Sequence, residues 1–193
     1  MTNNKLKGKD LINIGIYAAL TCVIITAVSM IGFVPILLPM IGIVAPLIAG
    51  IPLMLFMTKT KKFGMVTIMG TLLGAYLWLT GMGYWPCVFG IVCGLMADFI
   101  CKSGEYNSPK KAMIAHGVLS ITYFGCMVPL YLDLDAYFSV RQGFGDEYVT
   151  AIANFLQPWT LPVLVVGGFA AGLIGGWIGQ KLLKKHFTPA GIL

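Results

Sequence analysis

The chain has 193 residues, of which 58% are hydrophobic and only 10% are charged. A soluble globular domain carries about 25% charged residues and could not bury so much apolar surface, so the composition excludes a soluble fold and favours a protein dissolved in lipid. The net charge of +6 does not indicate a nucleic-acid partner, because the cations form short clusters between apolar runs. The five cysteines include no CxxC pair and predict neither a disulfide framework nor a zinc site.

Six apolar runs follow one another along the chain, and each approaches the roughly 20 residues that a transmembrane helix needs. The first is too long for a signal peptide and is expected to be retained. The second contains Pro46 and Pro52, which predict a kink or an irregular helix. The expected helices cover residues 11–31, 39–58, 63–80, 84–101, 111–131 and 159–183 of one transmembrane domain, residues 1–193.

The charges between these runs predict an orientation. All lysines lie before the first run, between the second and third, between the fourth and fifth, or at the end of the sixth. The opposite loops contain one cation, Arg141, and four acids. Since cytoplasmic loops are enriched in Lys and Arg, we expect six helices with both termini in the cytoplasm.

A long segment on the outer side, residues 133–158, carries a further helical pattern. Asp146 and Glu147 open it, and apolar residues then recur at helical spacing from Tyr148 to Leu156. This pattern predicts a short amphipathic helix on the outer surface, between the fifth and sixth transmembrane helices. Gly143 and Gly145 would let it move, so it is either a lid over a site or an interfacial connector.

Few polar groups lie inside the runs, and none predicts catalysis. Asp98 stands four residues before Lys102, a spacing that favours an ion pair near the cytoplasmic interface. His116 lies near the cytoplasmic end of the fifth run without a second ligand at metal-binding spacing. The chain contains no P-loop, no Gly-x-Ser-x-Gly and no His-Glu-x-x-His. We therefore expect no enzyme, no metal site and no cofactor of its own, and ATP hydrolysis for active transport would come from another chain.

The outer ends of the helices gather aromatic and polar residues that suit a small-molecule site. The alternative for any one of these aromatic residues is an ordinary interfacial belt. The candidate substrate-binding residues are Trp78, Tyr84, Trp85, Tyr131, Arg141 and Trp159.

Small residues also recur at four-residue spacing, which lets helix backbones approach closely in lipid. We expect the rows that begin at Gly70, Gly90 and Gly168 to pack within the bundle. The row of Gly15 and Ala19 in the first run is more open to a partner.

Four segments carry a family resemblance that extends over nearly the whole chain. They are GIYAAL at residues 15–20, KFGMVTIMG at 62–70, GLMADFI at 94–100 and GQKLLKKHF at 179–187. With six predicted helices and lysine-rich inner loops, the chain resembles the substrate-binding S components of energy-coupling-factor (ECF) ABC importers, and more narrowly the Trep–Strep group. The resemblance implies a location in the bacterial plasma membrane.

The resemblance also implies partners. An S component captures a small molecule from outside and delivers it inward together with a transmembrane scaffold subunit and two ABC ATPases, which use the ATP. Gly15 and Ala19 match the small-residue pair that docks on the scaffold, although a frame of Ala18 and Cys22 stays open. Haem or a related tetrapyrrole is the first substrate expected, with Arg141 for its propionates. The alternatives are a vitamin-type substrate or a standalone channel or secondary carrier.

Overall fold

The computed structural model describes residues 5–141 and 143–187, and this part of the chain is helical, without strands. Nine α-helices are joined by short turns and tighter helical segments. The α-helices are α1 (Gly8–Ser29), α2 (Ile41–Lys59), α3 (Met65–Leu77), α4 (Trp85–Ser103), α5 (Pro109–Ser120), α6 (Val128–Leu132), α7 (Leu134–Ser139), α8 (Asp146–Phe155) and α9 (Thr160–Leu182). The predicted fold class, an all-helical membrane bundle, is confirmed.

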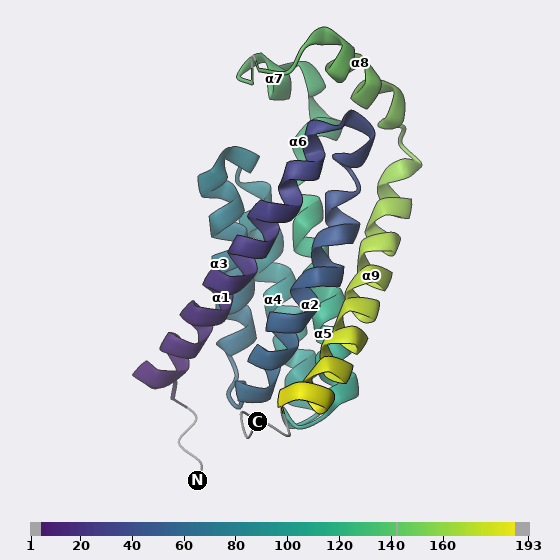
Figure 1. Cartoon of the computed structure of the whole chain (residues 1–193). Coiled ribbons are helices and arrows are strands. Elements are labelled where there is room, and N and C mark those ends of the chain that lie inside the picture. The colour runs from purple at the N-terminus through teal and green to yellow at the C-terminus, as the bar shows by residue number, and fades with distance from the viewer. Residues whose placement is uncertain (1–4, 142, 188–193) are drawn as a thin grey trace.

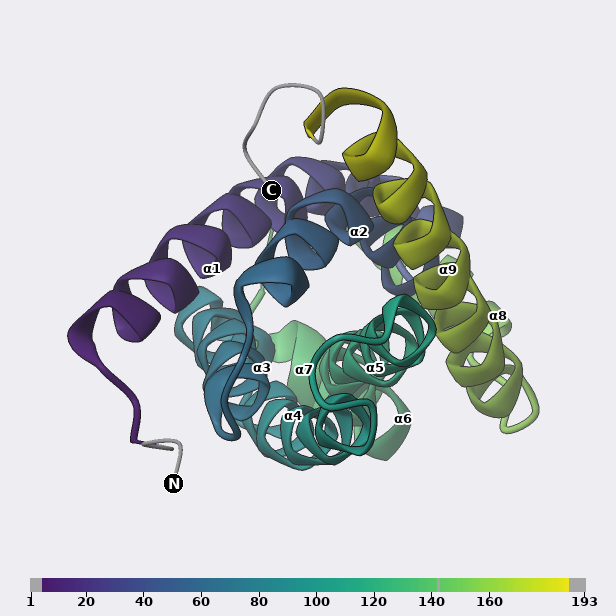
Figure 2. The same cartoon turned by 90° about the horizontal axis from the view of Figure 1, so that it is seen from below.

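The helices form a ring of rods when the bundle is viewed along its axis (Figure 2). The rods are the five long helices and the line of α5 and α6. Contacts run in the order α1, α2, α9, α5, α4, α3 and back to α1. Figure 1 shows α7 and α8 beyond one end of this ring. The chain therefore makes a closed bundle with a separate helical cover.

The two ends of the bundle differ in charge. The clusters of Lys7 and Lys9, of Lys61 and Lys62, and of the lysines that begin α5 and end α9 lie at one end, called the lysine end below. The other end carries Arg141, just after α7, and is called the arginine end (Figure 1). An even number of crossings brings the start of α1 and the end of α9 to the lysine end.

Five helical segments are long and apolar enough to cross a membrane: Gly8–Phe33, Ile41–Lys59, Met65–Met82, Trp85–Ser103 and Thr160–Lys185. The sixth expected span is interrupted, because a 3-10 segment, η4 (Ile121–Cys126), separates α5 from α6. Pro129 lacks an N–H group and cannot bond to the carbonyl of Gly125 as a helix requires. A Cβ atom on Gly125 would lie 2.6 Å from the Cα atom of Pro86, so this segment approaches α4 closely.

The second run forms a helix that contacts His116 of the fifth run. α2 is one continuous helix that contains both Pro46 and Pro52, so no break is observed, and the predicted kink stays a prediction. The carbonyl oxygen of Pro46 lies 3.0 Å from Nε2 of His116. This histidine is fully buried and stands seven residues into α5, which is about two turns and deeper than expected.

Glycines bring pairs of helices into backbone contact. Gly50 of α2 meets Gly175 and Gly179 of α9, where a Cβ atom on Gly179 would lie 2.9 Å from the side chain of Met54. Between α3 and α4, a Cβ atom on Gly94 would lie 3.0 Å from the carbonyl oxygen of Thr67. The rows in the third, fourth and sixth runs therefore pack inside the bundle, as predicted.

Asp98 has a structural role, but the predicted partner is wrong. Its side chain is fully buried, and Oδ2 accepts hydrogen bonds from Gly64 N at 2.7 Å and from Thr67 N and Oγ1 at 3.0 and 2.9 Å. Oδ1 accepts from the Tyr106 hydroxyl at 3.0 Å. Asp98 thus caps the N-terminus of α3 from a neighbouring helix. Lys102 instead lies over the ring of Phe63, 5.3 Å from its centroid.

Candidate functional site

A cavity of about 360 Å³ lies at the arginine end, beneath α7 and α8. Its walls come from α1, α2, α3, η4 and the two covering helices, so residues far apart in sequence meet there. Apolar and aromatic side chains dominate the lining, as is typical of small-molecule sites, and the volume lies in their usual range. Seven aromatic rings contribute: Phe33, Tyr76, Tyr123, Tyr137, Phe138, Phe144 and Tyr148.

The cover is held by specific contacts. The Tyr148 hydroxyl of α8 donates to the carbonyl oxygen of Gly32, at the far end of the first rod. Phe138 of α7 packs edge-on against Phe144 and Tyr148, with ring centroids 5.7 and 6.0 Å apart. Ile152 anchors α8 and is fully buried. α8 was predicted, and α7 was not; α8 covers the cavity, which favours a lid over a plain connector.

Arg141 is the cation of this cavity. Its guanidinium carbon lies 3.7 Å from the ring centroid of Tyr137, Nη1 donates to the Tyr137 carbonyl oxygen at 2.5 Å, and Nη2 donates to the Gly81 carbonyl oxygen. The residues that line the cavity include no carboxylate. A cation positioned by neutral groups leaves its charge available to an anionic ligand.

The tyrosine hydroxyls of the cover are donors at neutral pH. Burial raises the pKa of Tyr148 to about 12. Burial also raises the pKa of Tyr137, against the opposing effect of Arg141. Tyr137 donates to the sulfur of Met82 at 3.8 Å. The cavity therefore offers hydroxyl donors and a guanidinium, with methionine sulfur as soft apolar surface.

Tyr123 lines the cavity and carries a buried hydroxyl, unpaired among the described residues. The residue is only 6% exposed, and its buried hydroxyl has no hydrogen-bond partner in the described protein. Buried hydroxyls are nearly always paired, because an unpaired one costs about 1–3 kcal/mol. Tyr123 lines the cavity, but its unpaired hydroxyl oxygen is itself enclosed by protein, so Phe should be tolerated at this position.

The structure brings one of the six predicted binding residues into this cavity, namely Arg141. Trp78, Tyr84 and Trp159 are each more than half exposed. Trp85 stacks on Tyr84 with ring centroids 5.0 Å apart, and the Tyr131 hydroxyl pairs with that of Thr160 at 2.5 Å. None of these five lines the cavity, and the interfacial belt stays the alternative for them.

The predicted docking pair on α1 lies on an open surface. Gly15 and Ala19 are both exposed, and a Cβ atom added to Gly15 would meet nothing within 4 Å. Ile16 and Val23 beside them are 53% and 68% exposed. Ala18, which belongs to the other possible frame, is buried, so Gly15 and Ala19 present the accessible pair.

The described residues include no group of three or more His, Cys, Asp or Glu side chains placed to hold a metal ion. His116 lies outside the cavity lining, and its Nδ1 has no partner in the described protein. The side chain of His186 lies outside the part of the chain whose side chains are described.

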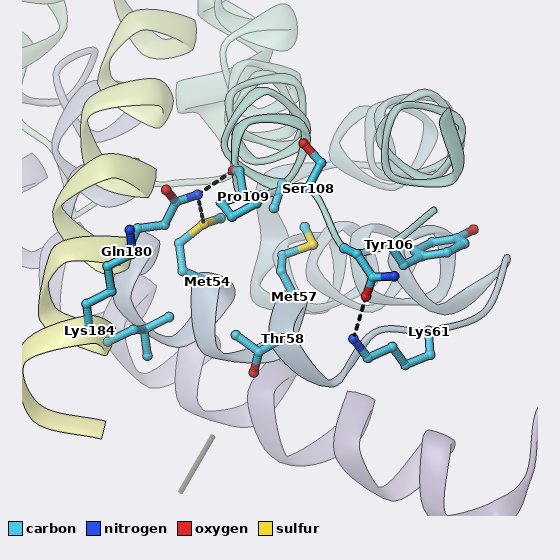
Figure 3. Close-up of a pocket in the computed structure, with 12 residues that line it drawn as sticks. Met54, Met57, Thr58, Lys61, Tyr106, Ser108, Pro109, Gln180 and Lys184 are labelled. Atoms are coloured by element: carbon cyan, nitrogen blue, oxygen red, sulfur yellow. Dashed lines mark hydrogen bonds between the residues drawn. The ribbon is translucent and has the colours of Figure 1, made fainter. Parts of the chain in front are cut away.

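A second cavity, of about 280 Å³, opens at the lysine end between α2, α5 and α9 (Figure 3). It has no wall residue in common with the first cavity. The bundle therefore has one chamber toward each end.

Residues 8–188 match the sequence profile of a family described as hypothetical bacterial integral membrane proteins, Trep_Strep. The chain belongs to this family. No curated protein and no solved structure gave a match. Membership establishes an integral membrane protein of bacteria, in agreement with the apolar helices.

Proposed function

We propose that the protein is the substrate-binding subunit of an ECF-type ABC importer. It captures a small molecule in the cavity at the arginine end and delivers it inward with a scaffold subunit and two ATPases. The observation that carries the proposal is the covered aromatic cavity, in which Arg141 is a cation among lining residues that include no carboxylate. The resemblance to S components, noted from the sequence, supplies the partners.

The proposal assigns the arginine end to the outside and the lysine end to the cytoplasm, following the lysine bias. Single cysteines placed at Ser108 and Arg141, in a chain whose native cysteines are replaced, test this assignment. A membrane-impermeant maleimide should label position 141 in intact cells and position 108 only after the membrane is opened. The reverse pattern would contradict the proposed direction of capture.

Haem or a related tetrapyrrole is our first candidate substrate. The aromatic lining suits a macrocycle, Arg141 suits a propionate, and Met82 or Met127 could ligate the iron. A flat macrocycle would also require α7 and α8 to lift, since the cavity lies near the lower end of the volumes usual for ligand sites. The same volume suits a vitamin-type substrate, which is the alternative within this transporter class.

Titration of the purified protein decides between these substrates. A Soret band after addition of haem, weakened about tenfold in affinity by Arg141→Gln, would support a tetrapyrrole carboxylate bound by Arg141. Trp159→Ala is the matched control, because it removes an exposed aromatic ring at the same end. A loss in the control and none in Arg141→Gln would place the site elsewhere.

The partners are tested by affinity purification from the native membrane. An S component should recover a transmembrane scaffold and two ATPases. Gly15→Leu and Ala19→Leu should abolish this recovery without changing ligand binding, since both positions face away from the cavity. Recovery of the chain alone under conditions that preserve complexes would favour a standalone channel or carrier.

A further inference from the structure

The cavity at the lysine end is built from three segments that converge there. α2 supplies Met54 and Met57, the loop before α5 supplies Tyr106 and its neighbours, and α9 supplies Gln180 (Figure 3). Met54 and Met57 are 1% and 6% exposed and form an apolar floor. The cavity is therefore apolar at depth and polar around its opening.

The charge around this opening has one sign. Lys61 and Lys184 line the cavity, and no carboxylate does. Nζ of Lys61 donates to the neutral amide oxygen of Asn107 at 3.2 Å, so that hydrogen bond leaves its positive charge uncompensated. Figure 3 shows the two lysines on different segments, with the floor methionines between them. An anionic group above the floor would lie between two cations.

The walls are fixed before any ligand arrives. Nε2 of Gln180 donates to the carbonyl oxygen of Pro109 and lies 3.8 Å from the sulfur of Met54, so α9 is joined to both α5 and α2. Glu105 and Tyr106 have φ values of 52° and 56°, a left-handed conformation that costs free energy in residues other than glycine and needs support from its surroundings. The support at Tyr106 is its hydrogen bond to the buried carboxylate of Asp98.

We propose that this cavity binds the anionic headgroup of a membrane lipid, such as a phosphatidylglycerol. Lys61 and Lys184 would hold the phosphate, and Met54, Met57 and Leu183 would contact the glycerol and the first acyl carbons. The bundle end that gathers lysines is where lipid headgroups lie, and basic pockets between transmembrane helices are suited to acidic lipids. The apolar floor favours a lipid over a soluble phosphate, because a soluble phosphate has no apolar surface to bury against the floor.

Native mass spectrometry of the full-length protein in detergent can measure this binding. The probes are dioleoylphosphatidylglycerol and dioleoylphosphatidylcholine, which share their acyl chains, with glycerol 1-phosphate as the soluble anion. Replacing both lysines (Lys61→Gln with Lys184→Gln) should weaken phosphatidylglycerol binding about 25-fold, or about fivefold for each charge. The control replaces Lys7 and Lys9 by Gln, two exposed lysines at the same end that do not line the cavity, and should change the affinity less than twofold.

A third variant tests the cavity without changing charge. Ala112 lines it, and Ala112→Leu should lower phosphatidylglycerol occupancy by filling space, while phosphatidylcholine binding at other surfaces stays constant. Equal losses in the two lysine pairs would overturn the proposal, because general surface charge would then explain binding. Glycerol 1-phosphate that competes at the same concentration as the lipid would overturn the lipid assignment. Thermal melting of each variant confirms that a loss reflects binding and not unfolding.

Discussion

Asp98 offers the sharpest test of the architecture, because its role differs from the one that its spacing to Lys102 predicts. The perturbation is Asp98→Ala. It removes four hydrogen bonds at once, two of them from the backbone N–H groups of Gly64 and Thr67 at the start of α3. Because the site is fully buried, water cannot replace the carboxylate without entering the bundle.

The magnitude follows from these contacts. Loss of an N-terminal cap costs about 0.5–2 kcal/mol, and the hydroxyls of Thr67 and Tyr106 each lose a bond worth about 0.5–1.5 kcal/mol. We therefore expect Asp98→Ala to lower the free energy of unfolding by about 2–4 kcal/mol. Asp98→Asn keeps one carbonyl oxygen for the backbone donors and should cost about half as much. Lys102→Gln loses only its contact with Phe63, about 0.5 kcal/mol.

The three buried thiols of Cys93, Cys101 and Cys126 provide the assay. A maleimide dye that fluoresces on reaction with a thiol reports unfolding of the purified protein as these cysteines become exposed on heating. The expected order of melting temperature is wild type and Lys102→Gln together, then Asp98→Asn, then Asp98→Ala. If Lys102→Gln destabilised the protein as much as Asp98→Ala, the predicted ion pair would be right and the cap wrong.

Three further outcomes are expected. Gly50→Ala should destabilise the bundle by more than about 2 kcal/mol in the same melting assay, since its Cβ atom would collide with the backbone of Gly175. The control, Gly15→Ala, should change the stability by no more than about 0.5 kcal/mol, because its Cβ atom would meet nothing within 4 Å. Tyr123→Phe should leave the stability of the ligand-free protein unchanged or slightly higher, because it deletes an unpaired buried hydroxyl; marked destabilisation would reveal a partner for it within the protein. Tyr148→Phe should raise the rate of amide hydrogen exchange in α8 about two- to tenfold, because the hydrogen bond to Gly32 is lost. An unchanged exchange rate would show that this hydrogen bond does not hold the cover.

Much of the fold could be predicted because lipid imposes simple rules. Apolar runs of fixed length indicated the long helices. Small residues at four-residue spacing indicated that the third, fourth and sixth runs pack within the bundle, and the structure supplies the partners, α3 with α4 and α9 with α2. The break at η4 could not be read from hydropathy, since its residues are as apolar as a continuous helix. It follows from Pro129, a local signal in the sequence, and from the close approach of Gly125 to α4, which depends on the neighbouring helix.

The site was harder to predict. An aromatic residue near a helix end faces either lipid or the interior, depending on how the helix is rotated about its own axis, and the composition of the sequence does not specify that rotation. Tyr76 and Trp78 illustrate this. They are two residues apart, which is about 200° around a helix; Tyr76 lines the cavity, while Trp78 is 54% exposed. Tyr123 carries no local signal either, because its position in an apolar run says nothing about an unpaired hydroxyl.

The packing between the two cavities bears on how a cargo would cross. Phe124 is 1% exposed, and its ring fills the space between α2 and α9. A Cβ atom added to Gly42 of α2 would lie 2.9 Å from this ring. A Cβ atom added to Gly168 of α9 would lie 2.9 Å from the carbonyl oxygen of Gly42. Closely packed cores switch between discrete arrangements and do not deform continuously. A channel or a carrier with alternating access would have to separate these backbones, whereas a subunit that moves as a body carries its closed cavity with the packing intact. The glycine contacts of α2 and α9 thus favour the proposed S component over a standalone carrier.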